Sequence, residues 1–179
     1  MQVASLRFGV WGCGFEVTGV TCSMKTATVQ ELKKELQGHT ASELLELCLR
    51  LAKFKKENKE LLTYLLFEAH DEESYIIAVK ELVDEDFSEL PRPSLYLTKK
   101  SLRKTLRTIN KYIRYAGSKQ VEVILLTYFC KQLRNSGIPY QKSTVLANLY
   151  EGQIKKIHAA LLLLHEDLQY DYRQELMGL

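Results

Sequence analysis

The sequence is poor in the residues that interrupt helices. It contains three prolines, Pro91, Pro93 and Pro139, and only five of its nine glycines follow residue 23. Because proline and glycine are the strongest helix breakers, long stretches of the chain can remain helical. Strict alternation of apolar and polar residues, the pattern of a half-buried strand, is missing outside the first 23 residues. These absences favour an all-α fold.

Signatures of membrane insertion and of common chemistry are also missing. No run of 18 apolar residues occurs, so no spanning helix is expected. The cysteines form no Cys-x-x-Cys pair, and no histidine stands at zinc-finger spacing from them. Gly-rich phosphate loops, Gly-x-Ser-x-Gly and His-Glu-x-x-His are absent. We therefore expect no enzyme, no cofactor, no small-molecule substrate and no membrane partner.

Disulfide-dense segments are absent too. Cys48 lies among leucines and Cys130 follows Phe129, so both are predicted to act as small apolar residues on helix faces. Disulfide scaffolds are usually smaller and denser in cysteine, which favours a reducing compartment. The expected location is cytoplasmic.

The first 23 residues differ from the rest because they hold four of the nine glycines. Met24-Lys25-Thr26 resembles an ordinary cytosolic start. We expect residues 1–23 to be a disordered tail or a mis-assigned start, with a short strand or an export segment as alternatives. A single all-α domain should then cover residues 24–179.

Capping patterns predict about seven helices. Thr28 and Thr40 each precede a glutamate by three residues, which is the pattern of a capping box. Asp71 and Thr98 are further expected caps, and Gly38 and Gly117 are expected left-handed stops. The expected helices cover about residues 28–37, 40–54, 61–69, 71–89, 98–116, 120–135 and 143–176. A polar turn is expected over residues 55–59, and a break in the last helix near Gly152.

The expected helices pair into two antiparallel hairpins, at residues 41–69 and 99–135. The letters Leu-Leu-Thr-Tyr occur at residues 61–64 and again at 125–128, each in the second helix of a hairpin. Repeated hairpins are typical of α-solenoids. The predicted architecture is therefore antiparallel hairpins forming a bundle or a short α-solenoid-like array.

Charge is strongly polarised in the middle of the chain. Residues 68–89 contain nine acidic residues and one base, whereas residues 90–121 contain nine bases and no acid. Within the basic part, an amphipathic helix over about residues 99–116 places apolar residues on one side and cations on the other. The candidate polyanion-binding residues on it are Lys99, Lys100, Arg103, Lys104, Arg107, Lys111, Arg114 and Tyr115. Tyr112 and Tyr115 could stack on single-stranded bases.

Three interpretations of this basic helix stay open. In the first, it is a solvated face neutralised by the acidic helix at residues 71–89. In the second, it contacts an acidic protein or a second copy of the chain. In the third, it binds nucleic acid. The sequence favours a non-catalytic binding protein that contacts a polyanion, either nucleic acid or an acidic protein. The alternative is a regulatory or assembly protein that works through homodimerisation or other protein contacts. A helix-turn-helix around Gly117 fits less well, because both flanking helices are long.

Other candidate chemistry has a simpler structural explanation. The acids from Glu68 to Glu73 surround His70 but stand at a helix start, where the dipole favours them. His158 and His165 lack matching ligands on another helix, so no metal is expected. They flank an apolar heptad stripe from Ile154 to Leu168, for which core packing is favoured over a dimer contact. Leu162 and Leu163 would widen that buried face.

Overall fold

A computed structural model describes residues 26–91 and 94–177 of the chain. These residues form eight α-helices and no strand, so the predicted all-α class is confirmed, with one helix more than expected. None of the described helices is both long and apolar enough to cross a membrane. The expectations for residues 1–23 fall outside the described part. Contacts divide the chain into two compact units that meet between Glu46 and Leu47.

The first unit contains α1 (Val29–Leu36) and the beginning of α2 (Ala41–Phe54). Both predicted capping boxes are confirmed. The Glu31 carboxylate accepts the Thr28 backbone N–H at 2.7 Å, and the Glu43 carboxylate accepts that of Thr40 at 2.8 Å. Gly38 is not the left-handed stop that was expected, because its φ is not positive and α1 ends with Gln37 in a right-handed conformation.

The second unit begins within α2 and continues into α3 (Lys56–Thr63). The predicted polar turn over residues 55–59 is wrong, because Lys55 alone is extended and the helix resumes at once. The Asn58 side-chain amide donates to the Leu51 carbonyl at 2.9 Å, which ties the two helices together across this break. α3 then runs directly into a π-helical turn, η1 (Tyr64–Glu68), closed by the Ala69 N–H bonding the Tyr64 carbonyl at 2.9 Å.

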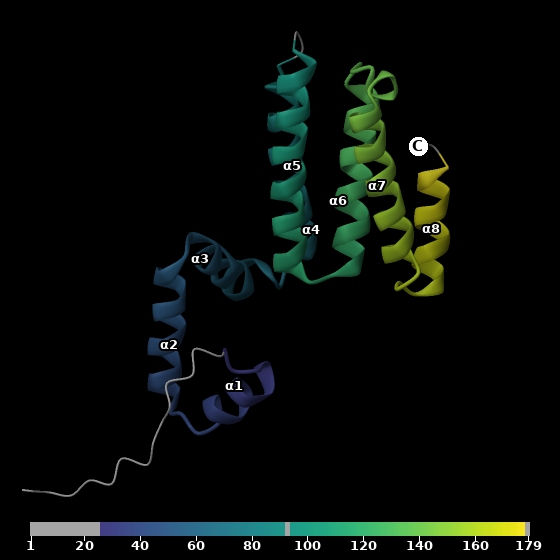
Figure 1. Cartoon of the computed structure of the whole chain (residues 1–179). Helices are drawn as coiled ribbons and strands as arrows, with labels where there is room; N and C mark the ends of the chain where they lie inside the picture. Colours follow the sequence, from purple (N-terminus) through teal and green to yellow (C-terminus); the bar gives the residue numbers. More distant parts are fainter. Residues whose placement is uncertain (1–25, 92–93, 178–179) are drawn as a thin grey trace, which may run out of the picture. The chain divides into compact units, whose positions relative to one another are not determined.

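The helical core consists of the longer helices that follow. They are α4 (Glu72–Ser88), α5 (Leu95–Ala116), α6 (Lys119–Asn135), α7 (Thr144–Leu161) and α8 (Glu166–Leu176), with a short 3₁₀ turn η2 (Tyr140–Lys142) before α7. Helix α6 is central, since it packs against α4, α5 and α7 (Figure 1). Helices α5 and α6 run antiparallel and are joined at Gly117, whose φ of 64° confirms the predicted left-handed stop.

The interior is built around α6 and the inner face of α5. Phe129, Leu125 and Leu126 of α6 and Leu102 and Ile109 of α5 have no solvent exposure. Burying each such side chain contributes about 1.5–3 kcal/mol, so this pair of helices is the most firmly held part of the fold. The predicted inward side of α4 is confirmed by the burial of its valines and isoleucine at 76, 79 and 83.

Helix α5 begins earlier than the sequence suggested. Ser94 is the N-cap, and its hydroxyl accepts the Leu97 N–H at 3.4 Å. Thr98, the expected cap, lies inside the helix, and its buried hydroxyl donates to the Pro91 carbonyl at 2.8 Å and to the Ser94 carbonyl at 2.9 Å. The helix therefore gains almost one turn at its N-terminus, and Tyr96 becomes part of it.

The C-terminal region also differs from expectation. Gly152 lies within α7, so a break there is wrong; the chain instead breaks between Leu161 and Glu166, where His165 is extended. The apolar stripe does pack into the core, with Ile157 and Leu161 buried. Leu162 and Leu163 stand in the break itself and are 68% and 69% exposed, so they do not widen the buried face.

Candidate polyanion-binding face on α5

Helix α5 holds its cations on one side because the other side is fixed in the core. Leu102, Leu106 and Ile109 are buried at the helical spacing of four and three residues. Arg103, Lys104 and Arg107 lie on the opposite side of the same turns and are exposed. Burial of one face therefore determines which side chains reach water. We define the basic face as Lys99, Lys100, Arg103, Lys104 and Arg107.

The basic face is hollowed. A groove of about 610 Å³ runs along it and is lined by Lys99, Lys100, Arg103, Arg107, the edge of Leu106 and Tyr96. The Tyr96 ring is 74% exposed at the start of the helix. The sequence interpretation missed Tyr96 because it placed the helix start at Thr98. Its position three and four residues before Lys99 and Lys100 is the signal that would have placed it beside them.

None of the five cations is neutralised by a close acid within the described residues. Helix α4 packs against α5, and two acids of its region have partners elsewhere. Asp84 accepts hydrogen bonds at 2.7 Å from the Tyr128 hydroxyl and from the Gln132 amide of α6. Asp71 caps its own helix by accepting the Ser74 N–H at 3.0 Å. The positive potential of the basic face therefore remains open to a ligand.

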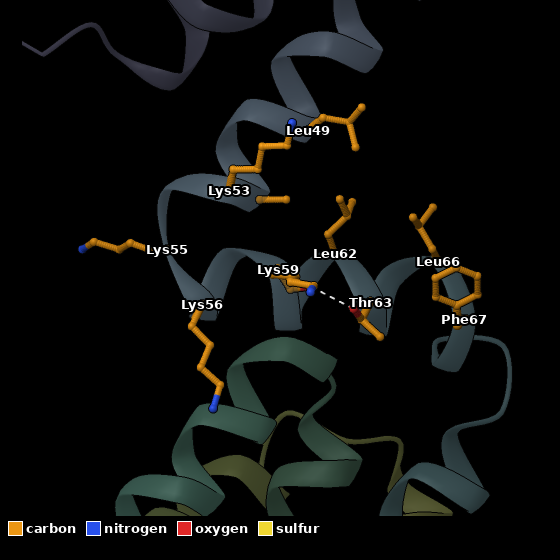
Figure 2. A pocket seen from close by; sticks show the side chains of 10 residues that line it. Leu49, Lys53, Lys55, Lys56, Lys59, Leu62, Thr63, Leu66 and Phe67 are labelled. Carbon is orange, nitrogen blue, oxygen red and sulfur yellow. Dashed lines mark hydrogen bonds between the residues drawn. The ribbon is translucent and has the colours of Figure 1, made fainter.

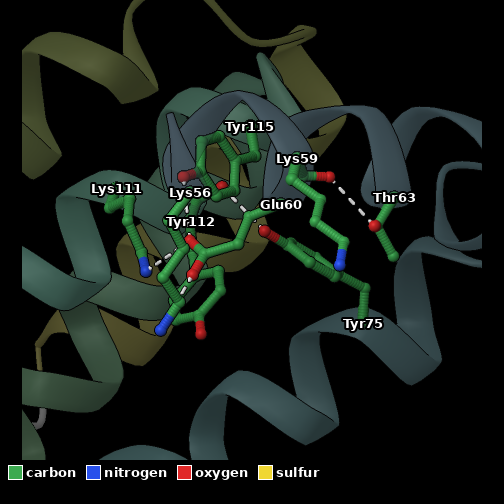
Figure 3. Close-up of polar contacts among 8 residues, drawn as sticks. All are labelled: Lys56, Lys59, Glu60, Thr63, Tyr75, Lys111, Tyr112 and Tyr115. Atoms are coloured by element: carbon green, nitrogen blue, oxygen red, sulfur yellow. Dashed lines mark hydrogen bonds and ion pairs between the residues drawn. The ribbon is translucent and has the colours of Figure 1, made fainter. Parts of the chain in front are cut away.

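Two of the predicted site residues are engaged inside the protein (Figure 3). One Glu60 carboxylate oxygen, on α3, accepts hydrogen bonds from the Lys111 ammonium at 2.8 Å and from the Tyr115 hydroxyl at 3.1 Å. The Lys111 ammonium also lies 4.8 Å from the centre of the Tyr112 ring. We call Glu60, Lys111 and Tyr115 the α3–α5 clamp. Arg114 is exposed but lies almost two turns beyond Arg107.

The clamp changes the protonation of its members. The hydrogen bond from Lys111, followed by that from Tyr115, holds the pKa of Glu60 below its usual value despite partial burial. Burial first, and the Glu60 carboxylate second, raise the pKa of Tyr115 to about 12. Glu60 is thus charged and Tyr115 neutral at physiological pH, which is the arrangement that keeps both hydrogen bonds.

Tyr112 and Tyr115 belong to an aromatic cluster rather than to an open stacking platform. Ring centres lie 4.6 Å apart for Tyr64 and Tyr75, 6.2 Å for Tyr75 and Tyr112, and 6.1 Å for Tyr112 and Tyr115. The buried Tyr75 hydroxyl donates to the Tyr112 carbonyl at 2.9 Å, and burial raises its pKa. These rings join α4, α5 and η1, so Tyr96 is the aromatic side chain of α5 that remains available to a ligand.

The described residues offer no assembled metal site, since no three His, Cys, Asp or Glu side chains converge among them. Glu60, which faces α5 from α3, already accepts a hydrogen bond from Lys111. What the α5 surface offers chemically is charge and hydrogen-bond donors. No protein-family model matches the chain, and neither the curated proteins nor the solved structures give a significant match.

Proposed function

We propose that this chain is a non-catalytic binding protein whose basic face on α5 contacts a phosphate-rich polymer, with single-stranded nucleic acid as the preferred form. The observation that supports it is the groove lined by Lys99, Lys100, Arg103 and Arg107, with Lys104 on the same helix, none of them in an ion pair among the described residues. Arginine donates to phosphate in a planar fork, and lysine adds a mobile point charge. Such donors position a backbone without reading its sequence.

The dimensions suit a short stretch of backbone. Lys99 and Arg107 are eight residues apart, which is about 12 Å along a helix. That length matches about three or four phosphates of one strand of duplex DNA, at about 3.4 Å each. Tyr96 at the end of the row gives an exposed ring on which an unpaired base can stack, typically worth about 1–3 kcal/mol. A duplex keeps its bases stacked inside, so Tyr96 favours single strands.

The test is fluorescence anisotropy of labelled random single-stranded and duplex oligonucleotides with the full chain across a salt series. Three or four neutralised phosphates predict a log–log salt slope of about −2 to −3 on single strands and about −3 to −3.5 on duplex. Arg103→Gln with Arg107→Gln should weaken binding at least about tenfold and reduce the slope by about 1.4–1.8. Lys155→Gln with Lys156→Gln, which removes two exposed cations from α7, is the matched control.

The comparison ligands separate the alternatives. Tyr96→Ala should lower the affinity of the chain for single strands more than its affinity for duplex. If poly-glutamate binds as tightly as the oligonucleotides, the preferred partner is an acidic protein rather than nucleic acid. If no oligonucleotide binds even at low salt, and Arg103→Glu with Arg107→Glu instead abolishes a dimer seen by sedimentation, the basic face serves homodimerisation and the proposal is refuted.

A further inference from the structure

A second surface, separate from the basic face, carries apolar side chains that nothing in its own unit covers. It lies on the last part of α2, on α3 and on η1. Of the apolar side chains that line its recess, Leu49 is 46% exposed, Leu66 63% and Phe67 68%. Proteins that act alone seldom expose contiguous apolar patches of this kind, so such patches mark interaction sites.

This surface is concave. A groove of about 590 Å³ lies between α2 and α3, and its apolar floor is made by Leu49, Ala52, Leu62, Leu66 and Phe67. Figure 2 shows Leu49 on α2 facing Leu62 and Leu66 across the open space. Leu62 and Leu66 are four residues apart and therefore lie one above the other along the helix. We call this recess the α2–α3 groove.

One end of the α2–α3 groove is positively charged. Lys53 and Lys59 flank it beside the α2–α3 turn, and no carboxylate lines it. Lys56, also at this end, turns toward Glu60, with its ammonium 3.7 Å from the carboxylate. Lys53 and Lys59 have no acid within ion-pair distance in the described part of the chain. The opposite end, at Leu66 and Phe67, is apolar.

We infer that the α2–α3 groove binds an amphipathic helix of a partner protein, with leucine-like side chains on the apolar floor and acidic side chains at the lysine end. An apolar stripe laid into a hydrophobic groove is an established mode of helix recognition. Uncompensated lysines favour a ligand that brings carboxylates. The negative C-terminal end of a helix suits the same place, so the partner's C-terminal half should lie beside Lys53 and Lys59.

Other occupants fit the groove less well. A second copy bound through the same surface would bring no carboxylate to Lys53 and Lys59, because that surface has none in its lining. An anionic bilayer attracts lysines, but it takes up protruding apolar side chains, whereas Leu49 and Leu62 sit in the recess. The apolar floor also excludes a nucleic-acid backbone. This inference goes beyond the function proposed for α5 and uses none of the same residues.

The experiment uses labelled helical peptides of about 18 residues, long enough for five turns. All carry the same leucine stripe on an alanine scaffold. One has glutamates in its C-terminal half, a second has them in its N-terminal half, and a third has lysines in the C-terminal half. Anisotropy with the full chain should show the first peptide binding most tightly and the third at least about tenfold more weakly.

Variants of the chain make the test specific. Leu66→Glu should lower the affinity for the first peptide at least about tenfold. Leu162→Glu, a control at a leucine of similar exposure outside the groove, should leave that affinity unchanged. Lys53→Glu with Lys59→Glu should invert the preference toward the lysine peptide. Because these side chains are exposed, circular dichroism and thermal melting of each variant should match the parent chain.

Three results would overturn the inference. One is the absence of binding by any peptide at high micromolar concentration. Another is binding that ignores both the peptide charge and Leu66→Glu. The third is a chain dimer, or binding to vesicles of anionic lipid, that Leu66→Glu abolishes while the peptides fail to bind; it would assign the groove to a second copy or to a membrane surface. Oligonucleotide binding by these variants should stay unchanged, which keeps this test independent of the basic face.

Discussion

Replacing Glu60 by glutamine tests how α3 is held to α5. The carboxylate accepts from Lys111 at 2.8 Å and from Tyr115 at 3.1 Å. The side chains of Glu60 and Lys111 keep 27% and 23% of their exposure, so water screens their attraction less than that of a surface pair. Hydrogen bonds to charged groups contribute about 1.5–3 kcal/mol, and the amide of Glu60→Gln retains one acceptor. We expect a loss of about 1–2 kcal/mol.

Urea unfolding of the full chain followed by circular dichroism measures this loss. With a slope of about 2 kcal/mol per molar urea, the midpoint should fall by about 0.5–1 M. A double-mutant cycle with Lys111→Met should give a coupling free energy of about 1 kcal/mol, since the two groups touch. Tyr115→Phe, which removes only the second donor, should cost less than Glu60→Gln.

The pH dependence follows from the lowered pKa of Glu60. A carboxyl whose pKa is lower in the folded state contributes stability above its unfolded pKa, about 4.3, and loses it as the pH falls through the folded value. The difference in unfolding free energy between the parent chain and Glu60→Gln should therefore be full at neutral pH and shrink in acid. Additive effects in the cycle, or a difference that does not change in acid, would refute the clamp.

Three further predictions concern the core and the turns. In a chain whose two cysteines before residue 24 are serine, iodoacetamide should modify exposed Cys48 in the folded state but Cys130 only after unfolding, because burial raises the pKa of Cys130 to about 12. Gly117→Ala should destabilise the chain by about 1 kcal/mol or more in urea unfolding because of its φ of 64°, whereas Gly152→Ala within α7 should be neutral or stabilising. Phe129→Ala should cost about 3–5 kcal/mol by the same measurement.

Each of these predictions has a clear contradiction. Rapid folded-state labelling of Cys130 would mean that the core opens readily near α6. Equal effects of the two glycine substitutions would mean that the left-handed conformation of residue 117 does not require glycine. A small cost for Phe129→Ala would mean that α4, whose Phe87 ring packs edge-to-face on Phe129 with the ring centres 5.6 Å apart, collapses into the vacated space.

Local signals were readable wherever a side chain acts on its neighbouring backbone. Thr28 and Thr40 were predictable as capping-box residues and Asp71 as the cap of α4, because capping depends only on residues three positions away. The amphipathic face of α5 was readable for a similar reason, since helical periodicity alone separates Ile109 from Arg107. Thr98 was misread because a threonine cap and a threonine bonding back to a carbonyl look alike in sequence.

Long-range contacts were not readable. Glu60 and Lys111 are 51 positions apart, so the removal of Lys111 and Tyr115 from the surface required knowing that α3 packs on α5. The exposure of Leu65, Leu66 and Phe67 was hidden for another reason. An apolar run predicts that its side chains are buried, but burial inside the chain and burial against a partner give the same pattern. In this fold the run stays exposed to solvent.

The π-helical turn at Tyr64–Glu68 differs from an α-helical turn by one residue, which matters for how the groove could have evolved. Such a turn holds one residue more than an α-helical turn, so a single inserted codon in an ordinary helix creates it. The insertion rotates all that follows by about 100°, because each residue adds that angle. Within this turn Tyr64 is buried beside Tyr75, whereas Leu66 and Phe67 face outward. Gain or loss of that one residue would therefore redirect the side chains that form the apolar end of the α2–α3 groove, and would also change how the core helices after it join α3.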